Sequence, residues 1–308
     1  MYLEYYLKQL NYQNKPAFLQ KYLLSPSLNR LKHIGYFCGM DYASKNIYNF
    51  TEYITRFDHS LTVSLLVYNL TKDKNMTIAG LFHDISTPCF SHVIDYMNQD
   101  FEKQESTEEY TSQILKSDTY LTSCLKKDNI SINDIINFKQ YPIVDNDRPK
   151  VCADRIDGVI LTGIGWTKNI STADIKEIVN DLEITKNEFN EPEIGFKTAK
   201  VAKKVLTVSK EIDLYCHSYE DNYMMILLAK ITSYAIKKNI ITYHDLYTYH
   251  EKDLFTLLKE QNNQILNSLL NEFETIKKEN IPSTEIPKLK ARKLNPLVNG
   301  KRIITMEN

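Results

Sequence analysis

Residues 81–95 read LFHDISTPCFSHVID. Within this stretch, His83 and Asp84 end a short apolar segment that is predicted to be helical from Met76, and Pro88 prevents the helix from continuing smoothly. An imidazole and a carboxylate are costly to bury at the end of a packed helix unless they are paired or bind a metal ion. The stretch therefore indicates a helical core with a group of polar side chains on its inner side.

Two other segments carry side chains of the same kinds on apolar helix faces. RFDHS at 56–60 opens a predicted helix whose inner face continues with apolar residues at helical spacing, and Asp154 shares such a face within 151–161. Three helices can present these side chains to one cation. A set of two imidazoles and two carboxylates suits Mn, Fe, Co or Ni in octahedral geometry, with positions open for water and a substrate oxygen. The predicted ligands are His59, His83, Asp84 and Asp154.

The rest of the chain favours an all-α fold. Further helices are predicted over 105–116, 131–138, 197–214 and 219–238, with a loop over 141–150 and a polar interruption over 185–195. From about residue 280 the sequence becomes basic, with six Lys or Arg against two Glu, and KRIIT at 301–305 is a candidate short strand.

These patterns divide the chain into two parts. We predict one helical domain over residues 1–280, with its core at about 30–260, and a basic C-terminal extension over 281–308. Such an extension is interpreted as solvated, with docking to a neighbouring subunit or binding of an anion as alternatives.

Composition limits the class of protein. The chain has 308 residues, of which 43% are hydrophobic and 25% charged, and these fractions exclude disorder as the main state. A net charge of -1 provides no global basic field for a nucleic-acid polymer. Five scattered cysteines without a CxxC pair indicate reduced thiols in a cytoplasm. No signal peptide is expected, and no apolar run approaches the roughly 20 residues that a bilayer requires, so no membrane partner is predicted.

The motifs resemble those of a known family. His59, His83-Asp84 and Asp154 are similar to the H…HD…D signature of the HD-domain metal-dependent phosphohydrolases. FHDISTPCFSHVID resembles the HDxxxxPFSH segment of their deoxynucleoside triphosphate triphosphohydrolase (dNTPase) branch, and Arg56 in RFDHS matches the RFxHS before the first ligand there. The resemblance covers roughly residues 30–260 and implies the helical HD-domain fold.

The resemblance also implies roles for individual residues. His59, His83, Asp84 and Asp154 would be the metal ligands, holding one divalent ion (Mn, Fe, Co, Ni or Mg). Arg56 and Arg155 would contact phosphate oxygens, with an ion pair to Asp58 or Asp157 as the alternative. His92 would act near the phosphates as a hydrogen-bond donor or proton carrier.

Three further residues are candidates for the same site. Glu105 would correspond to the acidic residue that the family has downstream of the HD motif, or would simply favour a helix N-terminus. His217 and Tyr219, in YCHSYEDNY, are candidates to face the nucleoside.

The implied reaction is hydrolysis of a nucleotide, with a deoxynucleoside triphosphate cleaved to nucleoside and tripolyphosphate by metal-activated water. A nucleoside 5'-monophosphatase and a catalytically weakened nucleotide sensor are the alternatives. Thr87 and Gln104 stand where the triphosphohydrolases commonly have His, and Gly158 stands near a common aromatic position, leaving room beside the ligand. A homo-oligomer is expected from the resemblance alone.

Overall fold

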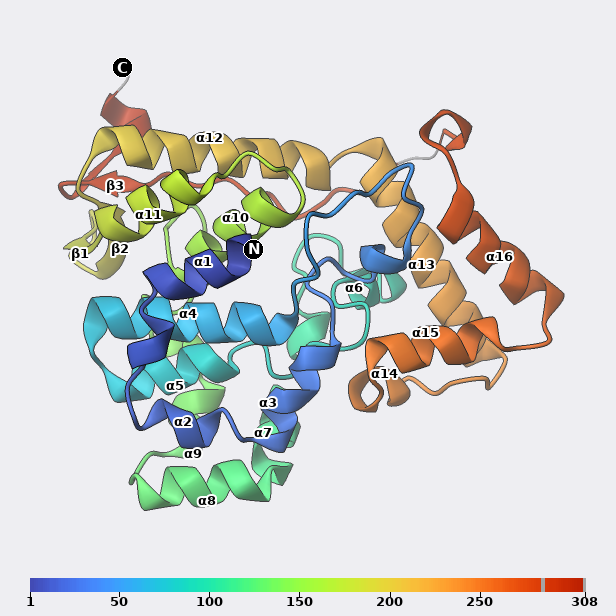
Figure 1. Cartoon of the computed structure of the whole chain (residues 1–308), viewed down its shortest axis with the longest axis horizontal. Coiled ribbons are helices and arrows are strands. Elements are labelled where there is room, and N and C mark those ends of the chain that lie inside the picture. The colour runs from blue at the N-terminus through green and yellow to red at the C-terminus, as the bar shows by residue number, and fades with distance from the viewer. Residues whose placement is uncertain (284–285, 307–308) are drawn as a thin grey trace.

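Helices make up most of the computed structural model, which describes residues 1–283 and 286–306 (Figure 1). The first half contains α1 (Tyr2–Gln9), α2 (Leu19–Tyr22), α3 (Pro26–Arg30), α4 (Arg56–Thr71), α5 (Lys74–Phe82), α6 (Val93–Met97), α7 (Thr111–Ser117), α8 (Thr119–Lys127) and α9 (Ile132–Ile136). The second half contains α10 (Ala153–Gly165), α11 (Thr172–Asp181), α12 (Ala199–Cys216), α13 (Tyr219–Lys237), α14 (Asp245–Thr248), α15 (Glu251–Lys259) and α16 (Gln264–Thr275). The predicted helical class is confirmed.

Short 3-10 turns connect several of these helices. They are η1 (Tyr12–Asn14), η2 (Leu31–His33), η3 (Met40–Tyr42), η4 (Ser106–Glu108), η5 (Phe138–Gln140), η6 (Lys278–Asn280) and η7 (Ile303–Met306). In the part of the chain that the structure describes, no helix combines the length and the apolar character needed to cross a bilayer.

Helices α4, α5 and α10 form the centre, with α4 packed against the other two. A capping box starts α4, because the Asp58 N–H donates to the Thr55 hydroxyl (3.1 Å) and the Thr55 N–H donates to the Asp58 carboxylate (2.8 Å). The predicted helix from Met76 is α5, but it ends at Phe82, so His83 and Asp84 lie just beyond its last turn. The polar pair is therefore presented at a helix end.

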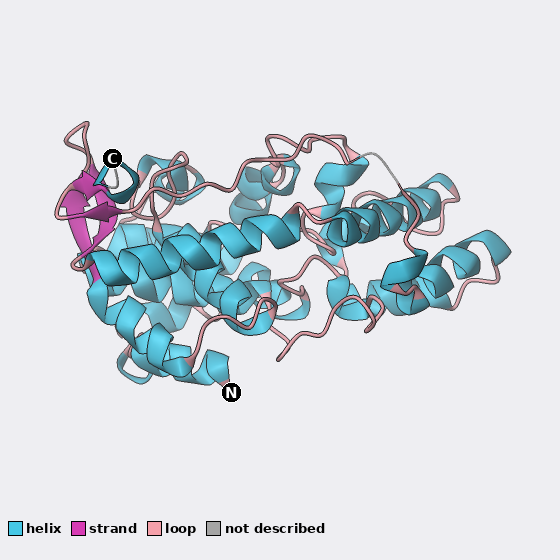
Figure 2. Cartoon of the chain, turned by 90° about the horizontal axis from the view of Figure 1, so that it is seen from above, coloured by secondary structure: helices cyan, strands magenta, loops and turns pink. Residues whose placement is uncertain are grey.

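One small sheet lies at an end of the molecule (Figure 2). Its strands, in spatial order, are β1 (Leu182–Lys186), β2 (Pro192–Phe196), β3 (Leu297–Val298) and β4 (Lys301–Arg302). β1 and β2 are antiparallel, with Leu182 opposite Phe196, whereas β3 runs parallel to β2. The polar interruption predicted over 185–195 is thus the turn and second strand of a hairpin. The strand predicted in KRIIT is confirmed as β4.

The other predicted boundaries were close to those observed. The helices expected over 197–214 and 219–238 are α12 and α13, and 141–150 is a loop. The helix expected over 105–116 begins only at Thr111, because the Asp100 carboxylate accepts the N–H groups of Glu105 and Ser106 and holds a turn there. The helix expected over 131–138 is α9, capped by Ser131.

Residues 286–296, which we call the C-terminal strap, run across the helical body towards the sheet (Figure 1). The Lys290 N–H donates to the Phe101 carbonyl (3.0 Å), and the Asn295 N–H donates to the Pro149 carbonyl (2.9 Å). These contacts fix the strap to two loops. The boundary predicted at residue 281 stays a prediction.

An ion pair anchors the segment that follows the strap. The Arg302 guanidinium bonds both carboxylate oxygens of the buried Glu193, at 2.6 and 2.8 Å. Glu193 also accepts the Val151 N–H (2.9 Å), so this pair connects β4, β2 and the start of α10. Bidentate pairing of this kind is the strongest form of side-chain ion pair.

Arg302→Ala is expected to lower the free energy of unfolding by about 3 kcal/mol, because it leaves the Glu193 carboxylate buried without its cation. Urea denaturation followed by circular dichroism measures the change. Lys301→Ala, which alters the exposed neighbour, serves as the control and should stay within about 0.5 kcal/mol of the parent protein. Equal stability of the two variants would contradict this account of the anchor.

A second buried carboxylate holds two loops next to the core. Glu251, at the start of α15, accepts the N–H groups of Gly35 (3.3 Å) and Phe90 (2.8 Å). Burial raises the pKa of Glu251 to about 8. The same carboxyl therefore binds its proton more tightly in the folded chain than in the unfolded chain.

This pKa predicts how stability depends on pH. Between about pH 5 and 8 the folded chain retains a proton on Glu251 that the unfolded chain loses, so Glu251 lowers stability by about 1.4 kcal/mol per pH unit as pH rises. Glu251→Gln should flatten the measured slope by about that amount. Urea denaturation at several pH values tests this, with Asp253→Asn, on the exposed side of α15, as the control. An unchanged slope in Glu251→Gln would show the pKa argument to be wrong.

Candidate metal centre

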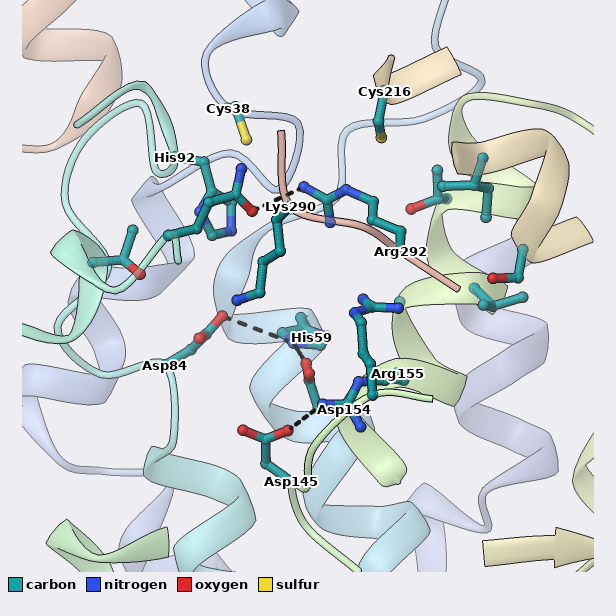
Figure 3. Close-up of a pocket in the computed structure, with 18 of the residues that line it drawn as sticks. Cys38, His59, Asp84, His92, Asp145, Asp154, Arg155, Cys216, Lys290 and Arg292 are labelled. Carbon is teal, nitrogen blue, oxygen red and sulfur yellow. Dashed lines mark hydrogen bonds and ion pairs between the residues drawn. The ribbon is translucent and has the colours of Figure 1, made fainter. Parts of the chain in front are cut away.

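The structure brings the predicted ligands together from three segments. His59 lies on α4 and Asp154 lies in the first turn of α10 (Figure 3). His83 directly follows α5. His59 Nε2 is 3.1 Å from Asp154 Oδ1, and His83 Nε2 is 3.6 Å from the same oxygen. One ligand atom from each of the three residues lies within 4.8 Å of the others. One cation fits between them.

Asp84 completes the group from the side of α5. Its Oδ1 is 3.7 Å from His83 Nε2, and its Oδ2 is 3.8 Å from His59 Nε2. Arg56 Nη1 donates to the same Oδ2 at 3.0 Å. The carboxylate is thereby held facing both imidazoles.

Hydrogen bonds on the outer side of each imidazole determine which nitrogen faces inwards. His83 Nδ1 donates to the Gly80 carbonyl (2.8 Å), and His59 Nδ1 donates to the Asp157 carboxylate (2.7 Å). Asp157 is fully buried and also accepts the Tyr6 hydroxyl (2.8 Å). Protonation at Nδ1 leaves the lone pair on each Nε2, which is the arrangement that metal-binding histidines use.

One buried atom supports a metal ion directly. His83 Nε2 is buried and has no hydrogen-bond partner among the described residues. A buried polar nitrogen without a partner is unfavourable by itself, and a coordinated cation removes that cost. The donor set of two imidazole nitrogens and two carboxylates therefore fits a divalent ion.

Charges at the site favour a bound cation. Burial opposes ionisation of Asp84, but the two imidazoles and Arg56 outweigh it and lower the pKa of Asp84 to about 2. The hydrogen bond from His59 and the nearby His83 imidazole hold the pKa of Asp154 well below its ordinary value despite burial. Burial likewise opposes the charged form of His59, yet its carboxylate neighbours raise its pKa to about 10.

A second group of donors is less suited to a cation. Asp145, Cys152 and Asp154 also place ligand atoms within 4.8 Å of one another. Burial raises the pKa of the Cys152 thiol, whose Sγ lies 3.7 Å from Asp145 Oδ1. A metal ligand must be a thiolate, so this group offers a poor site.

The two predicted arginines contact acids other than those considered from the sequence. Arg56 is buried against Asp84, and Arg155 Nη2 donates to Asp145 Oδ1 (3.1 Å). The loop around Asn146 also accepts from the Arg155 guanidinium. The alternative pairs with Asp58 or Asp157 are not formed, because Asp58 caps α4 and Asp157 binds His59. Contact of either arginine with phosphate stays a prediction.

Three of the four remaining predicted residues line the main cavity. His92 lines the main cavity, and its Nδ1 bonds the buried Asp95 at 2.8 Å. Glu105 lies at the exposed edge of the cavity, and His217 also lines it. Tyr219, the first residue of α13, is not among the described residues that line this cavity. Their roles stay predictions.

The cavity has a volume of about 990 Å³ and leads from the ligands to a group of aromatic side chains. Phe37 and Phe50 stack at 4.3 Å, and Trp166 lies beside them. Tyr36 packs on His59, and a Cβ at Gly158 would lie 3.3 Å from the Tyr36 hydroxyl. Tyr36 therefore occupies the space beside the ligands that the glycine leaves.

Sequence reasoning did not find several of these residues. The aromatic group comes from loops, where no periodicity signals burial. Asp157 lies one helical turn after Asp154, and only this spacing could have indicated it. Arg148, Lys290 and Arg292 also line the cavity. The basic composition of the tail is a signal for Lys290 and Arg292, but it does not indicate that they reach this cavity.

Asp157→Asn is expected to weaken metal binding about 10- to 100-fold, because it removes the charge that orients His59 but retains the shape of the side chain. Titration calorimetry with Mn²⁺ measures the affinity, and circular dichroism verifies the fold. Tyr6→Phe, which removes only the second hydrogen bond to Asp157, should have a smaller effect. Full affinity in Asp157→Asn would exclude the proposed orienting role.

Comparisons with known proteins agree with this geometry. Residues 56–159 match the family model of the HD domain. The metal-dependent phosphohydrolase cns2 of Cordyceps militaris is 27% identical over 158 residues, which cover 51% of this chain and 42% of the relative. The uncharacterized protein YdhJ of Bacillus subtilis is 25% identical over 256 residues, which cover 82% of this chain and 74% of the relative.

The coverage differs between the two relatives. The aligned part spans less than half the length of the first protein and about three quarters of the second. The family match includes α4 and α5 and extends to the middle of α10. All four predicted ligands lie within the residues that match the HD-domain model.

Proposed function

We propose that the protein is a metal-dependent phosphohydrolase that acts on a nucleotide, with a deoxynucleoside triphosphate as substrate. The observation that carries the proposal is the convergence of two imidazole Nε2 atoms and two carboxylates at one end of a large cavity. The HD-domain match and the similarity to the metal-dependent phosphohydrolase of Cordyceps militaris support the same class of reaction.

His59, His83, Asp84 and Asp154 would hold the ion. When bound, a divalent cation neutralises phosphoryl charge and lowers the pKa of the attacking water. Arg56 keeps Asp84 ionised and aimed at the two imidazoles.

His92 is the residue best placed to move a proton. Because Nδ1 bonds the buried Asp95, Nε2 is the ring nitrogen left to face a substrate in the cavity. It would donate a proton to the leaving oxygen, which makes the leaving group neutral. Glu105, at the exposed edge of the cavity, is the second candidate for proton transfer.

The size of the cavity supports a whole nucleotide as the ligand. Ligand pockets commonly measure about 300–1,000 Å³, so a cavity of about 990 Å³ exceeds the needs of inorganic phosphate. Stacked Phe37 and Phe50 with Trp166 offer aromatic faces on which a base can stack. His217 lies on the same cavity wall.

One observation favours a second candidate, a nucleotide sensor with little turnover. Gln104 stands where the triphosphohydrolases have a histidine, and its side-chain oxygen accepts a hydrogen bond from Arg292 (3.2 Å). A glutamine amide neither gains nor loses a proton near neutral pH, so it cannot act as a general acid or base. A sensor of this kind would bind nucleotides at the same site.

A panel of nucleotides offered to Mn-loaded protein tests the proposal, with products separated by phosphate chain length. Tripolyphosphate is the expected product, orthophosphate would indicate the monophosphatase alternative, and tight binding without any product would favour the sensor.

Asp84→Ala should abolish both turnover and metal retention, because it removes one carboxylate and leaves Arg56 unpaired beside the site. Activity assays and metal analysis of the purified variant measure the two losses. Glu4→Gln, at an exposed position of α1, is the control and should retain both. Full activity in Asp84→Ala would rule out the proposed metal centre.

A further inference from the structure

Three basic side chains that line the cavity have no carboxylate partner in the described part of the chain. Lys290 Nζ donates only to the Lys103 carbonyl (2.7 Å), and Arg292 Nη2 donates to the Gln104 side-chain oxygen (3.2 Å). The Arg148 guanidinium forms no hydrogen bond or ion pair with residues 1–283 or 286–306. We call these three residues the cationic cluster.

Four other basic residues around the same cavity are paired with acids: Arg56 with Asp84, Arg155 with Asp145, Lys139 with Glu108 and Lys150 with Glu191. Lys103, which also lines the cavity, is exposed to solvent. Unpaired charges are rarely held close together out of water, because each raises the cost of the others.

The members of the cluster affect one another. Burial lowers the pKa of Arg148 to about 10, and the positive charge of Arg292 is the second cause of this shift. Burial and the two guanidinium groups also lower the pKa of Lys290. A bound anion would relieve this repulsion.

The strap holds two of these side chains in place. The Arg292 N–H donates to Asp213 Oδ1 (3.2 Å) on α12, while the Lys290 N–H donates to the Phe101 carbonyl (3.0 Å). In Figure 3 the Lys290 side chain extends from the strap towards Asp84, and the Arg292 side chain extends towards His92. Arg148 comes from the loop that the strap contacts at Pro149.

We propose that Arg148, Lys290 and Arg292 form a binding site for the phosphate chain of a nucleoside triphosphate, so that the C-terminal strap is part of the active site. The proposal rests on the proposed function, because it takes the metal centre as the place of hydrolysis. Guanidinium groups match pairs of phosphate oxygens, and an ammonium adds a point charge. A cluster of three cations favours a chain of phosphates over a single one.

Binding of inorganic tripolyphosphate to the metal-free full chain tests the site directly. Titration calorimetry should show at least tenfold weaker binding to Arg148→Ala and to Arg292→Ala than to the parent protein, since each loses a charge-assisted contact. Lys290→Ala should also bind more weakly. Lys288→Ala is the matched control, because Lys288 lies on the same strap, is 82% exposed and pairs with Glu102 outside this cluster.

Several results would overturn the proposal. Unchanged tripolyphosphate affinity in folded Arg148→Ala and Arg292→Ala, verified by circular dichroism, would do so. Equal weakening in Lys288→Ala would show a general charge effect. Displacement of tripolyphosphate by a single-stranded oligonucleotide at equal concentration would assign the cluster to a polynucleotide backbone.

Kinetics separate this proposal from the proposed function. If both hold, Arg292→Ala raises KM for a nucleoside triphosphate at least tenfold. If the parent protein binds tripolyphosphate through the cluster but hydrolyses no nucleotide with any divalent ion, the phosphate-binding proposal is supported and the proposed hydrolase function is wrong. If Arg148→Ala and Arg292→Ala hydrolyse the nucleotide with the same KM as the parent protein, the proposed function is supported and the phosphate-binding role of the cluster is wrong.

Discussion

The hydrogen bond between His59 Nδ1 and the Asp157 carboxylate, 2.7 Å long, lies where α4 meets α10. It joins two side chains that neither helix could bury alone, because each would leave a polar group without a partner. It also places His59 Nε2 opposite Asp154 on the same helix as Asp157. The packing of the central helices and the geometry of the ligands therefore depend on one contact.

From this contact the cavity extends through regions of different character. The predicted ligands include two carboxylates, the strap and the loop at 141–150 contribute cations, and Phe37 and Phe50 contribute aromatic rings to the same cavity. Under the proposed function, the cations would face the phosphates of a nucleoside triphosphate and the aromatic rings would face its base.

Much of the centre was predictable from the sequence. Helical spacing around His59 and Asp154, together with the pair at 83–84, pointed to the four candidate ligands that the structure brings close together, because a polar residue on an apolar face is costly without a partner. Thr55 and Asp73 immediately precede α4 and α5 and cap them through their side chains. The local part of the fold was thus determined by short-range signals.

The rest required contacts between distant parts of the chain. No periodicity indicates that Tyr36 would pack on His59, or that a hairpin would form around Asn187 and pair with a strand near residue 297. A basic tail is usually solvated, and its composition does not reveal that Lys290 and Arg292 would line the cavity. These features depend on loop conformation and on contacts between residues far apart in the sequence, which local sequence patterns do not predict.

The order of these parts along the chain has a consequence for synthesis. The ribosome produces all four ligands well before Lys290 and Arg292 emerge. A chain that has been synthesised only as far as α10 therefore still lacks the cations that the strap supplies. If the strap acts as proposed, such a chain would bind a nucleoside triphosphate more weakly until residues 286–296 have docked.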